Sequence, residues 1–343
     1  MIQKKMKEIY LLSCASASQG GGVYKYSLTE QGALKKTGYL PCDKPMYAVK
    51  DADRLHILLR APFEGNNIRN ENARATNAAG TAEEEKYSGY FTCKTDFSGQ
   101  TIVKSTLGKC ACHLAVDGDD CYIVNYLSGN IVKNCQIARI HGGKGINLAR
   151  QDMPHTHFAA FSPDKKYVLC CDLALDTVFV YDRNLNEISK AKVPDGYGIR
   201  HLVFAKDGKY LYAVNELVPS VSVFSYSAGK AKYINTVKLD CKNRNSTSAA
   251  IRLDEQENKL YVSVRGEDEI FIFNVSGDNL SFYGKLPCGG RGPRDFDIIG
   301  DYIVCTNENS DNVTVTDKNS CRIVEEISMK APLNVVKGRE NGF

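Results

Sequence analysis

The chain has 343 residues, of which 43% are hydrophobic and 24% are charged. This composition supplies enough apolar material for a large folded core and excludes a globally disordered chain. The 44 basic and 40 acidic residues leave a formal net charge of +4, which is too small to indicate nucleic acid or a membrane surface as a partner.

The N-terminal segment begins with basic residues and contains one short apolar run, Ile9 to Leu12. A run of this length predicts a β-strand and is too short for a signal peptide or a membrane-spanning helix. We therefore expect no targeting segment and no membrane partner.

Cysteine usage points to a reducing compartment. The chain has 13 cysteines, an odd number, and many lie in apolar runs such as the one with Cys170 and Cys171. Buried free thiols are typical of such a pattern, which favours a cytoplasmic protein over a disulfide framework. Cys110 and Cys112, next to His113, have no second ligand pair elsewhere, so we expect no metal site and no cofactor.

A pair of strands recurs along the whole chain. Each copy has an apolar strand, a polar break and a second strand in which apolar and polar residues alternate. The copies begin, in chain order, at Glu8, Asp53, Asp120, Lys165, Gly208, Asn258 and Asp301.

A further short strand, which ends in a turn, accompanies each pair. Six of these strands precede their pairs, and the seventh lies at the C-terminus although its pair lies at the N-terminus. In chain order they begin near Met46, His113, Phe158, His201, Ala249, Asp295 and Leu333.

A repeat of roughly 42 to 50 residues with about four strands is typical of a propeller blade. Pairing of the displaced C-terminal strand with the N-terminal strands would close the ring and remove an open sheet edge. The sequence therefore predicts an all-β fold, a single seven-bladed β-propeller over residues 1–343. The absence of Trp argues against the WD40 type.

The segment 64–88 is polar and has no strand periodicity. It interrupts the second repeat copy, so we interpret it as a surface insertion in blade 2. Long segments of this kind are either mobile loops or functional lids, and both interpretations stay open.

Strand direction predicts which residues meet. The starts of the first strands and the ends of the second strands converge at one mouth of the ring. Alignment of the first strands places the following residues at one level: Pro45, Cys112, His157, Arg200, Ala249, Arg294 and Pro332. The ends of the second strands add Asn125, Asp172, Asn215, Glu216, Arg265, Asn307 and Glu308.

This mouth gathers His157, Arg200, Arg265, Arg294 and Glu216. A single polar residue at a strand end is usually a turn cap or a surface group. Three arginines and a histidine that converge with one carboxylate cost stability unless that carboxylate or a bound anion compensates them. We therefore predict a pocket for a small anionic substrate, such as a phosphorylated sugar lactone or a polycarboxylate.

Several motifs resemble those of the propeller lactonases, which include bacterial 6-phosphogluconolactonase and fungal carboxymuconate-lactonising enzymes. The likeness is carried by Pro154-His-Thr-His157, Gly198-Ile-Arg200-His201, Val214-Asn215-Glu216, Ala250-Ile-Arg252, Val264-Arg265-Gly266 and Gly292-Pro-Arg294-Asp295. The resemblance implies a metal-independent site in which His157, Arg200, Glu216 and Arg265 are catalytic. The other polar residues of these motifs and strand ends are expected to bind substrate: His155, His201, Asn215, Arg252, Arg294 and Asn307.

The resemblance favours hydrolysis of a sugar-acid lactone of the 6-phosphogluconolactone type, in the pentose phosphate pathway. Opening of a lactone needs a water molecule deprotonated by a base, Glu216 or His157, and an oxyanion stabilised by Arg200 or Arg265. Two alternatives stay open: a cycloisomerase acting on a carboxymuconate, and a non-catalytic propeller that only binds its ligand.

Overall fold

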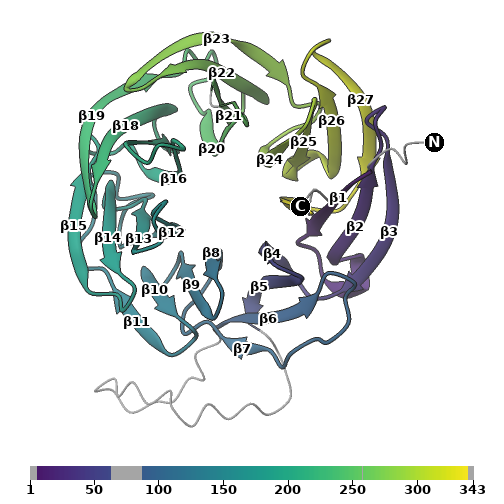
Figure 1. The fold of residues 1–343 in the computed structure, drawn as a ribbon, viewed down its shortest axis with the longest axis horizontal. Helices are drawn as coiled ribbons and strands as arrows, with labels where there is room; N and C mark the ends of the chain where they lie inside the picture. Colours follow the sequence, from purple (N-terminus) through teal and green to yellow (C-terminus); the bar gives the residue numbers. More distant parts are fainter. Residues whose placement is uncertain (1–5, 63–86, 257, 339–343) are drawn as a thin grey trace.

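The computed structural model describes residues 6–62, 87–256 and 258–338. In these residues, 28 strands form seven four-stranded antiparallel sheets, which stand around a common axis as blades (Figure 1). Two short 3-10 helices, Ala17–Gln19 and Glu308–Ser310, lie between strands, and no helix of the described residues could cross a membrane. The predicted seven-bladed propeller is confirmed.

Each blade has four strands, here given from the axis outward. Blade 1 has β28 (Pro332–Lys337), β1 (Lys7–Ser13), β2 (Gly22–Leu28) and β3 (Leu34–Pro41). Blade 2 has β4 (Pro45–Asp51), β5 (Arg54–Pro62), β6 (Ser88–Lys94) and β7 (Lys104–Ser105). Blade 3 has β8 (Ala111–Asp117), β9 (Asp120–Asn125), β10 (Asn130–Lys133) and β11 (Ile137–Ile140).

The remaining four blades follow the same order. Blade 4 has β12 (Thr156–Phe161), β13 (Tyr167–Asp172), β14 (Thr177–Asp182) and β15 (Glu187–Lys192). Blade 5 has β16 (Ile199–Phe204), β17 (Tyr210–Asn215), β18 (Ser220–Ser227) and β19 (Lys230–Lys238). Blade 6 has β20 (Thr247–Leu253), β21 (Lys259–Arg265), β22 (Glu269–Ser276) and β23 (Asn279–Pro287). Blade 7 has β24 (Pro293–Ile299), β25 (Tyr302–Asn307), β26 (Asn312–Asp317) and β27 (Arg322–Ser328).

The position of a strand within its blade explains its composition. Strand β13 is buried at nearly every residue, because neighbouring blades cover both faces of a second strand. The outermost strand β15 is exposed at most positions and is correspondingly polar. Between blades 5 and 6, Val214 and Val262 belong to one buried apolar cluster, so the core is a set of layers between blades.

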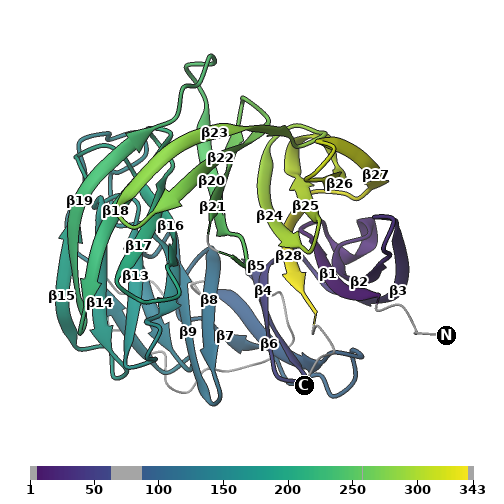
Figure 2. The same ribbon diagram turned by 45° about the horizontal axis from the view of Figure 1, so that its top comes forward.

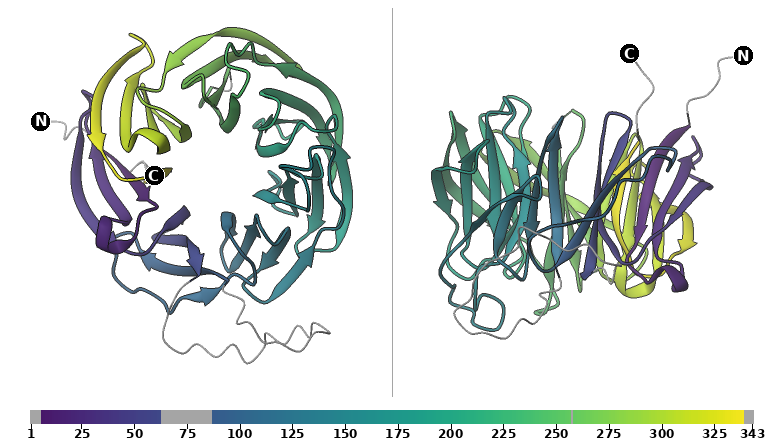
Figure 3. Two further views of the ribbon diagram at one scale, coloured as in Figure 1. Left: turned by 180° about the vertical axis from the view of Figure 1, so that it is seen from behind. Right: turned by 90° about the horizontal axis from the view of Figure 1, so that it is seen from below.

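The ring closes through the two ends of the chain. Strand β28 pairs antiparallel with β1, with Leu11 opposite Val335, and Ser13 donates a hydrogen bond to the Lys330 carbonyl at 2.5 Å. Figure 1 shows the yellow C-terminal strand beside the purple N-terminal blade, and Figure 3 shows the same ring from behind and edge-on. This is the closure that the displaced seventh strand predicts.

The predicted insertion at 64–88 falls almost entirely outside the described residues. The strands on either side of it, β5 and β6, pair with each other in the sheet of blade 2, with Pro62 opposite Ser88. The interruption therefore lies between the second and third strands of that blade.

Removal of the closing strand should abolish the fold. Strand β28 buries Leu333, Val335 and Val336, each worth roughly 1.5–3 kcal/mol, against a total stability of about 5–15 kcal/mol for a typical protein. A chain that ends after Lys330 should show no cooperative thermal transition by circular dichroism, whereas a chain that ends after Gly338 keeps β28 and should melt like the full chain. A cooperative melt of the shorter chain would contradict the dependence on closure.

Candidate active site

Every innermost strand carries a β-bulge near its start. In β16, Ile199 lies opposite Asn215 and His201 opposite Val214, so Arg200 has no partner residue across the ladder. The same shift leaves an extra residue in each of the other innermost strands. The bulge ring, as we term these residues, consists of Met46, Cys112, His157, Arg200, Ala249 with Ala250, Arg294 and Leu333.

The bulge ring corrects the sequence alignment at two positions. Pro45 and Pro332 were expected at the level of His157, but they are the first residues of their strands and pair regularly, with Leu59 and Ser13. Their neighbours, Met46 and Leu333, take the bulged positions. A bulge is a single unpaired residue that redirects one side chain, and apolar periodicity does not mark where it falls.

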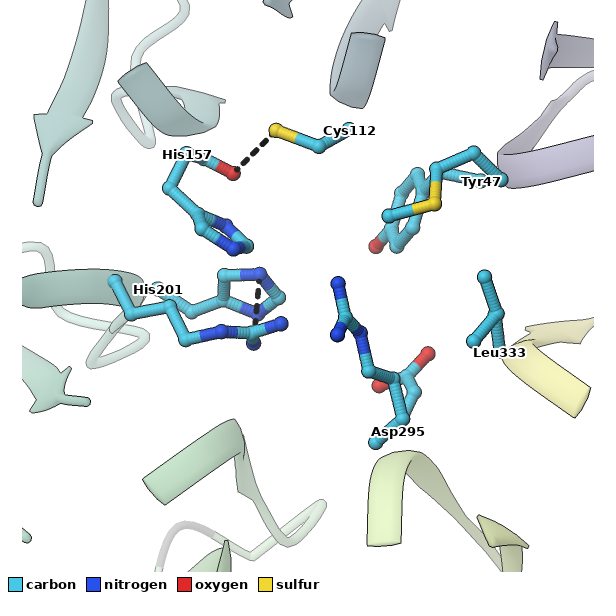
Figure 4. A pocket seen from close by; sticks show the side chains of 9 residues that line it. Tyr47, Cys112, His157, His201, Asp295 and Leu333 are labelled. Atoms are coloured by element: carbon cyan, nitrogen blue, oxygen red, sulfur yellow. Dashed lines mark hydrogen bonds between the residues drawn. The ribbon is translucent and has the colours of Figure 1, made fainter. Parts of the chain in front are cut away.

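A small pocket lies at the level of the bulge ring. Figure 4 shows His157, His201, Tyr47, Cys112 and Leu333 arranged around its centre, and Figure 2 shows the innermost strands running along the axis. Its lining consists of Met46, Tyr47, Cys112, His157, Arg200, His201, Arg294, Asp295 and Leu333.

Aromatic rings from blades 2 to 5 pack against one another next to this pocket. The centroid of His113 lies 4.2 Å from that of Tyr47 and 4.0 Å from that of Phe158, and Phe158 lies 4.8 Å from His201. Each of these residues directly follows a bulge residue, so they form the next layer along the strands. Two of these rings, Tyr47 and His201, also line the pocket.

Glu216 is the carboxylate on which the charged groups converge. It follows β17, is 5% exposed, and accepts hydrogen bonds from Arg200 Nε at 2.9 Å and Arg150 Nη2 at 2.5 Å, while Arg265 Nη2 lies at 3.2 Å. Burial alone would raise the pKa of Glu216, but the guanidinium groups of Arg265, Arg200 and Arg150 together hold it well below its usual value. Glu216 is therefore ionised and holds three guanidinium groups.

The backbone holds two of these arginines in place. Arg200 is almost fully buried, and its Nη1 donates to the Ala249 carbonyl at 2.6 Å and to His201 Nε2 at 3.1 Å. Arg265 Nη2 donates to the Ser248 carbonyl at 3.2 Å. Burial lowers the pKa of Arg200, and the Glu216 carboxylate opposes that effect.

The histidines of the pocket are neutral. Burial, followed by the positive charge of Arg200, lowers the pKa of both His157 and His201 well below the usual histidine value. Neither His157 Nδ1 nor His201 Nδ1 has a hydrogen-bond partner in the described structure, and the same holds for Ser248 Oγ and Arg265 Nε. Buried polar atoms without partners are rare, and all four belong to residues of blades 4, 5 and 6 or their ends.

The local charge is positive. Arg150, Arg200 and Arg265 face Glu216, and Arg294 pairs with Glu308 at 3.3 Å. These four guanidinium groups stand against two carboxylates, and the carboxylate of the lining residue Asp295 is paired with a fifth arginine, Arg252. Among the described residues, no group of three or more His, Cys, Asp or Glu side chains is arranged to hold a metal ion.

The structure brings the four predicted catalytic residues together, and it also places His201 and Arg294 in the pocket. His155 lies at the rim, stacked on Tyr126 with a centroid distance of 4.2 Å. Arg252 lies farther along β20 and pairs with Asp295 at 2.7 Å.

Asn215 and Asn307 lie outside the pocket, within their own blades. Both are fully buried. The Asn215 amide donates to Ser220 and Ser222, and the Asn307 amide donates to the Cys288 carbonyl and to Thr314. These bonds give both residues a structural role at the end of a second strand.

Sequence reasoning missed Arg150 and Tyr47. Arg150 belongs to the irregular segment between β11 and β12, which has no counterpart in the repeat, so no alignment could place it at the mouth. Tyr47 directly follows a bulge residue, and the position of the bulge was the missing signal.

Comparison with known proteins gives a family match over most of the chain. The family model described as "Lactonase, 7-bladed beta-propeller" matches residues 9–325. An uncharacterized protein of Staphylococcus aureus strain MSSA476 is 31% identical over 333 residues, which cover 88% of this chain and 90% of that protein. Another, from the bovine strain RF122 / ET3-1, is 28% identical with the same coverage.

Solved structures share the fold at lower identity. A Bacteroides fragilis protein, provisionally assigned as a 6-phosphogluconolactonase, superposes with a TM-score of 0.83 at 22% identity and covers 99% of both chains. The periplasmic gluconolactonase PpgL of Pseudomonas aeruginosa superposes with a TM-score of 0.81 at 20% identity, over 96% of this chain and 98% of its own. At these identities the likeness establishes the fold.

Replacement of Glu216 should destabilise the protein, because it leaves Arg200 and Arg265 without their buried counter-charge. We expect Glu216→Gln to lower the free energy of unfolding by about 3–5 kcal/mol, the usual cost of breaking a buried ion pair. Glu308→Gln removes a more exposed partner of one arginine and should cost less than about 1 kcal/mol. Urea unfolding at pH 7 measures both; equal stability of the two variants would contradict the central role of Glu216.

Proposed function

The chain belongs to the family of seven-bladed β-propeller lactonases, and on that premise we propose that it hydrolyses a sugar-acid lactone, with 6-phosphogluconolactone as the substrate. The observation that carries the proposal is the neutral, buried His157 beside the arginines that Glu216 holds. One pocket would then hold both a base that activates water and positively charged donors that stabilise the developing oxyanion.

His157 is the better base. Glu216 already binds three guanidinium groups through its two oxygens, so neither oxygen is free to take a proton from water. His157 is in its basic form at neutral pH, and its Nδ1 has no partner in the described structure. We assign proton abstraction to His157 and positioning of the arginines to Glu216.

The chemical steps follow from this assignment. His157 Nδ1 takes a proton from water as the water oxygen bonds to the lactone carbonyl carbon. The negative charge that develops on the carbonyl oxygen is stabilised by Arg200, which is fixed in place and shielded from solvent. Collapse of the tetrahedral intermediate breaks the ring ester bond, and the protonated His157 returns its proton to the departing ring oxygen. The product is the open hydroxy acid.

The charge of the pocket supports an anionic substrate. Four guanidinium groups face Glu216 and Glu308, and a fifth, Arg252, faces Asp295, so an excess of positive charge attracts an anion. The planar guanidinium fork suits phosphate and carboxylate oxygens. None of the relatives and structures compared above is named as a cycloisomerase, so we do not propose carboxymuconate as the substrate.

We also propose that the protein works in the cytoplasm. All 13 of its cysteines are free thiols in the structure, many of them buried. Burial raises the pKa of the thiols of Cys170 and Cys305 well above the usual value, which makes them unreactive. This pattern supports a reducing compartment.

Direct turnover tests the proposal. The protein should hydrolyse 6-phosphogluconolactone faster than the spontaneous reaction, and Arg200→Ala should reduce the rate by about 10²–10³, the usual effect of losing one oxyanion donor. Acid release at constant pH measures both rates. Turnover no faster than the spontaneous reaction, combined with tight binding of the product, would favour the non-catalytic propeller.

The pH dependence tests the base. Because the pKa of His157 is lowered, its neutral form persists below the usual histidine value, so kcat/KM should be level from about pH 8 to pH 6.5 and fall only in more acidic solution. His157→Gln should lower kcat by about 10²–10⁴. His56→Gln, in blade 2 and hydrogen-bonded to Tyr90, is the control and should keep the wild-type profile. A fall that begins above the usual histidine value would argue against His157.

A further inference from the structure

The segment between β11 and β12 is held firmly, although it has no regular secondary structure. At its start, the two ring nitrogens of His141 bond to Asp172 at 2.6 Å and to Tyr181 at 2.7 Å. At its end, His155 Nδ1 contacts the Tyr126 carbonyl at 2.9 Å. Both ends are thus fixed to blades 3 and 4.

The middle of the segment is fixed as well. Gln151 is fully buried, and its side chain donates to the Leu173 carbonyl at 3.0 Å. The Gly145 amide donates to the Gln151 carbonyl at 2.9 Å, and a side chain at Gly145 would collide with the Ala174 carbonyl. The Arg150 amide donates to the Asn147 carbonyl at 2.9 Å. The backbone of Arg150 is therefore preorganised at the mouth.

The side chain of Arg150 differs from those of the other two arginines on Glu216. It is 41% exposed, whereas the side chain of Arg200 is 3% exposed and that of Arg265 is 18% exposed. Arg200 and Arg265 also donate to backbone carbonyls of blade 6. Arg150 reaches Glu216 from the segment between β11 and β12, and its side chain also hydrogen-bonds to Tyr126.

These differences decide which arginine can change partner. If Arg200 or Arg265 left Glu216, a buried charge would lose its partner, which is costly. Arg150 can turn toward solvent at a smaller cost, since its side chain is 41% exposed and its charge would regain water, which the other two arginines could not. Glu216 would keep two guanidinium groups and remain neutralised.

We propose that Arg150 is the specificity-determining residue of the pocket: it exchanges Glu216 for the anionic group of the substrate at the solvent side. This inference rests on the proposed lactonase function, and it deepens it by assigning selection of a phosphorylated over an unphosphorylated lactone to one side chain. The backbone of Arg150 is held in place at the mouth, and its exposed guanidinium group is free to turn from Glu216 to the substrate.

A comparison of two lactones tests the proposal. In Arg150→Ala, KM for 6-phosphogluconolactone should rise by about 10- to 100-fold, as expected for loss of a charge-assisted contact, with kcat changed less than about threefold. KM for glucono-δ-lactone, which has no phosphate, should stay within about threefold of the wild-type value. A purely structural role of Arg150 would raise both KM values alike, and that result would overturn the proposal.

Arg291→Ala is the matched control. Arg291 is an exposed arginine that directly precedes the turn into β24 at the same mouth, and its Nη2 donates to the Asn309 carbonyl at 3.4 Å. Removal of this charge should change KM for either lactone by less than about threefold, because an exposed charge without substrate contact contributes little. A change as large as that of Arg150→Ala would mean that the general field of the mouth selects the substrate, and the proposal would fail.

Equilibrium binding separates this inference from the proposed function. Inorganic phosphate, titrated by calorimetry, should bind about tenfold more weakly to Arg150→Ala than to wild type, and equally well to Arg291→Ala. If wild type turns over neither lactone but shows this binding pattern, the lactonase proposal fails while the anion-binding role of Arg150 stands. Equal phosphate affinity in wild type and Arg150→Ala would refute that role. Thermal melts of Arg150→Ala within about 2 °C of wild type confirm that the variant is folded.

Discussion

The antiparallel pairing of β28 with β1 is the contact on which the rest of the structure depends. It joins the two ends of the chain in one sheet and fixes the seven innermost strands at a common height around the axis. Each of these strands carries its bulge near the same end, so closure forces the bulged side chains into one ring. The pocket forms because every innermost strand carries a β-bulge and closure of the ring brings the bulged residues to one level.

Glu216 makes it possible to bury positive charge in that ring. Arg200 and Arg265 are taken out of water, and their mutual repulsion is strong in a medium of low dielectric constant. One ionised carboxylate between them compensates most of this cost. The same field, acting with burial, keeps His157 and His201 neutral. Fixed cations and neutral imidazoles are therefore two results of one electrostatic arrangement.

The fold could be predicted from the sequence because the alternation of apolar and polar residues marks the repeated strands. The displaced last strand then indicates that the ring is closed. It also indicated that His157, Arg200, Glu216 and Arg265 meet, since strand direction decides which ends share a mouth. The level of each side chain along the propeller axis was harder to predict. Arg252 lies three residues beyond Ala249 in β20, which at roughly 3.3 Å per residue carries it about 10 Å past the bulge ring. Arg150 lies outside the repeat, so the strand periodicity could not predict its position.

Repetition of one bulge in seven blades also explains how a symmetric fold forms an asymmetric pocket. Blades 4, 5 and 7 place His157, Arg200 and Arg294 in the bulge ring, whereas blades 1, 2 and 3 place Leu333, Met46 and Cys112 there. Blade 6, between blades 5 and 7, adds the small side chains of Ala249 and Ala250. The polar and cationic residues of the ring therefore all lie on one side, and blades 1 to 3 make the other side apolar. A ligand with charged oxygens at one side and a carbon skeleton at the other has one favourable orientation, because reversal would bury its charge against Leu333 and Met46. The order of blades around the ring therefore fixes the side of the pocket at which the charged oxygens of such a ligand would lie.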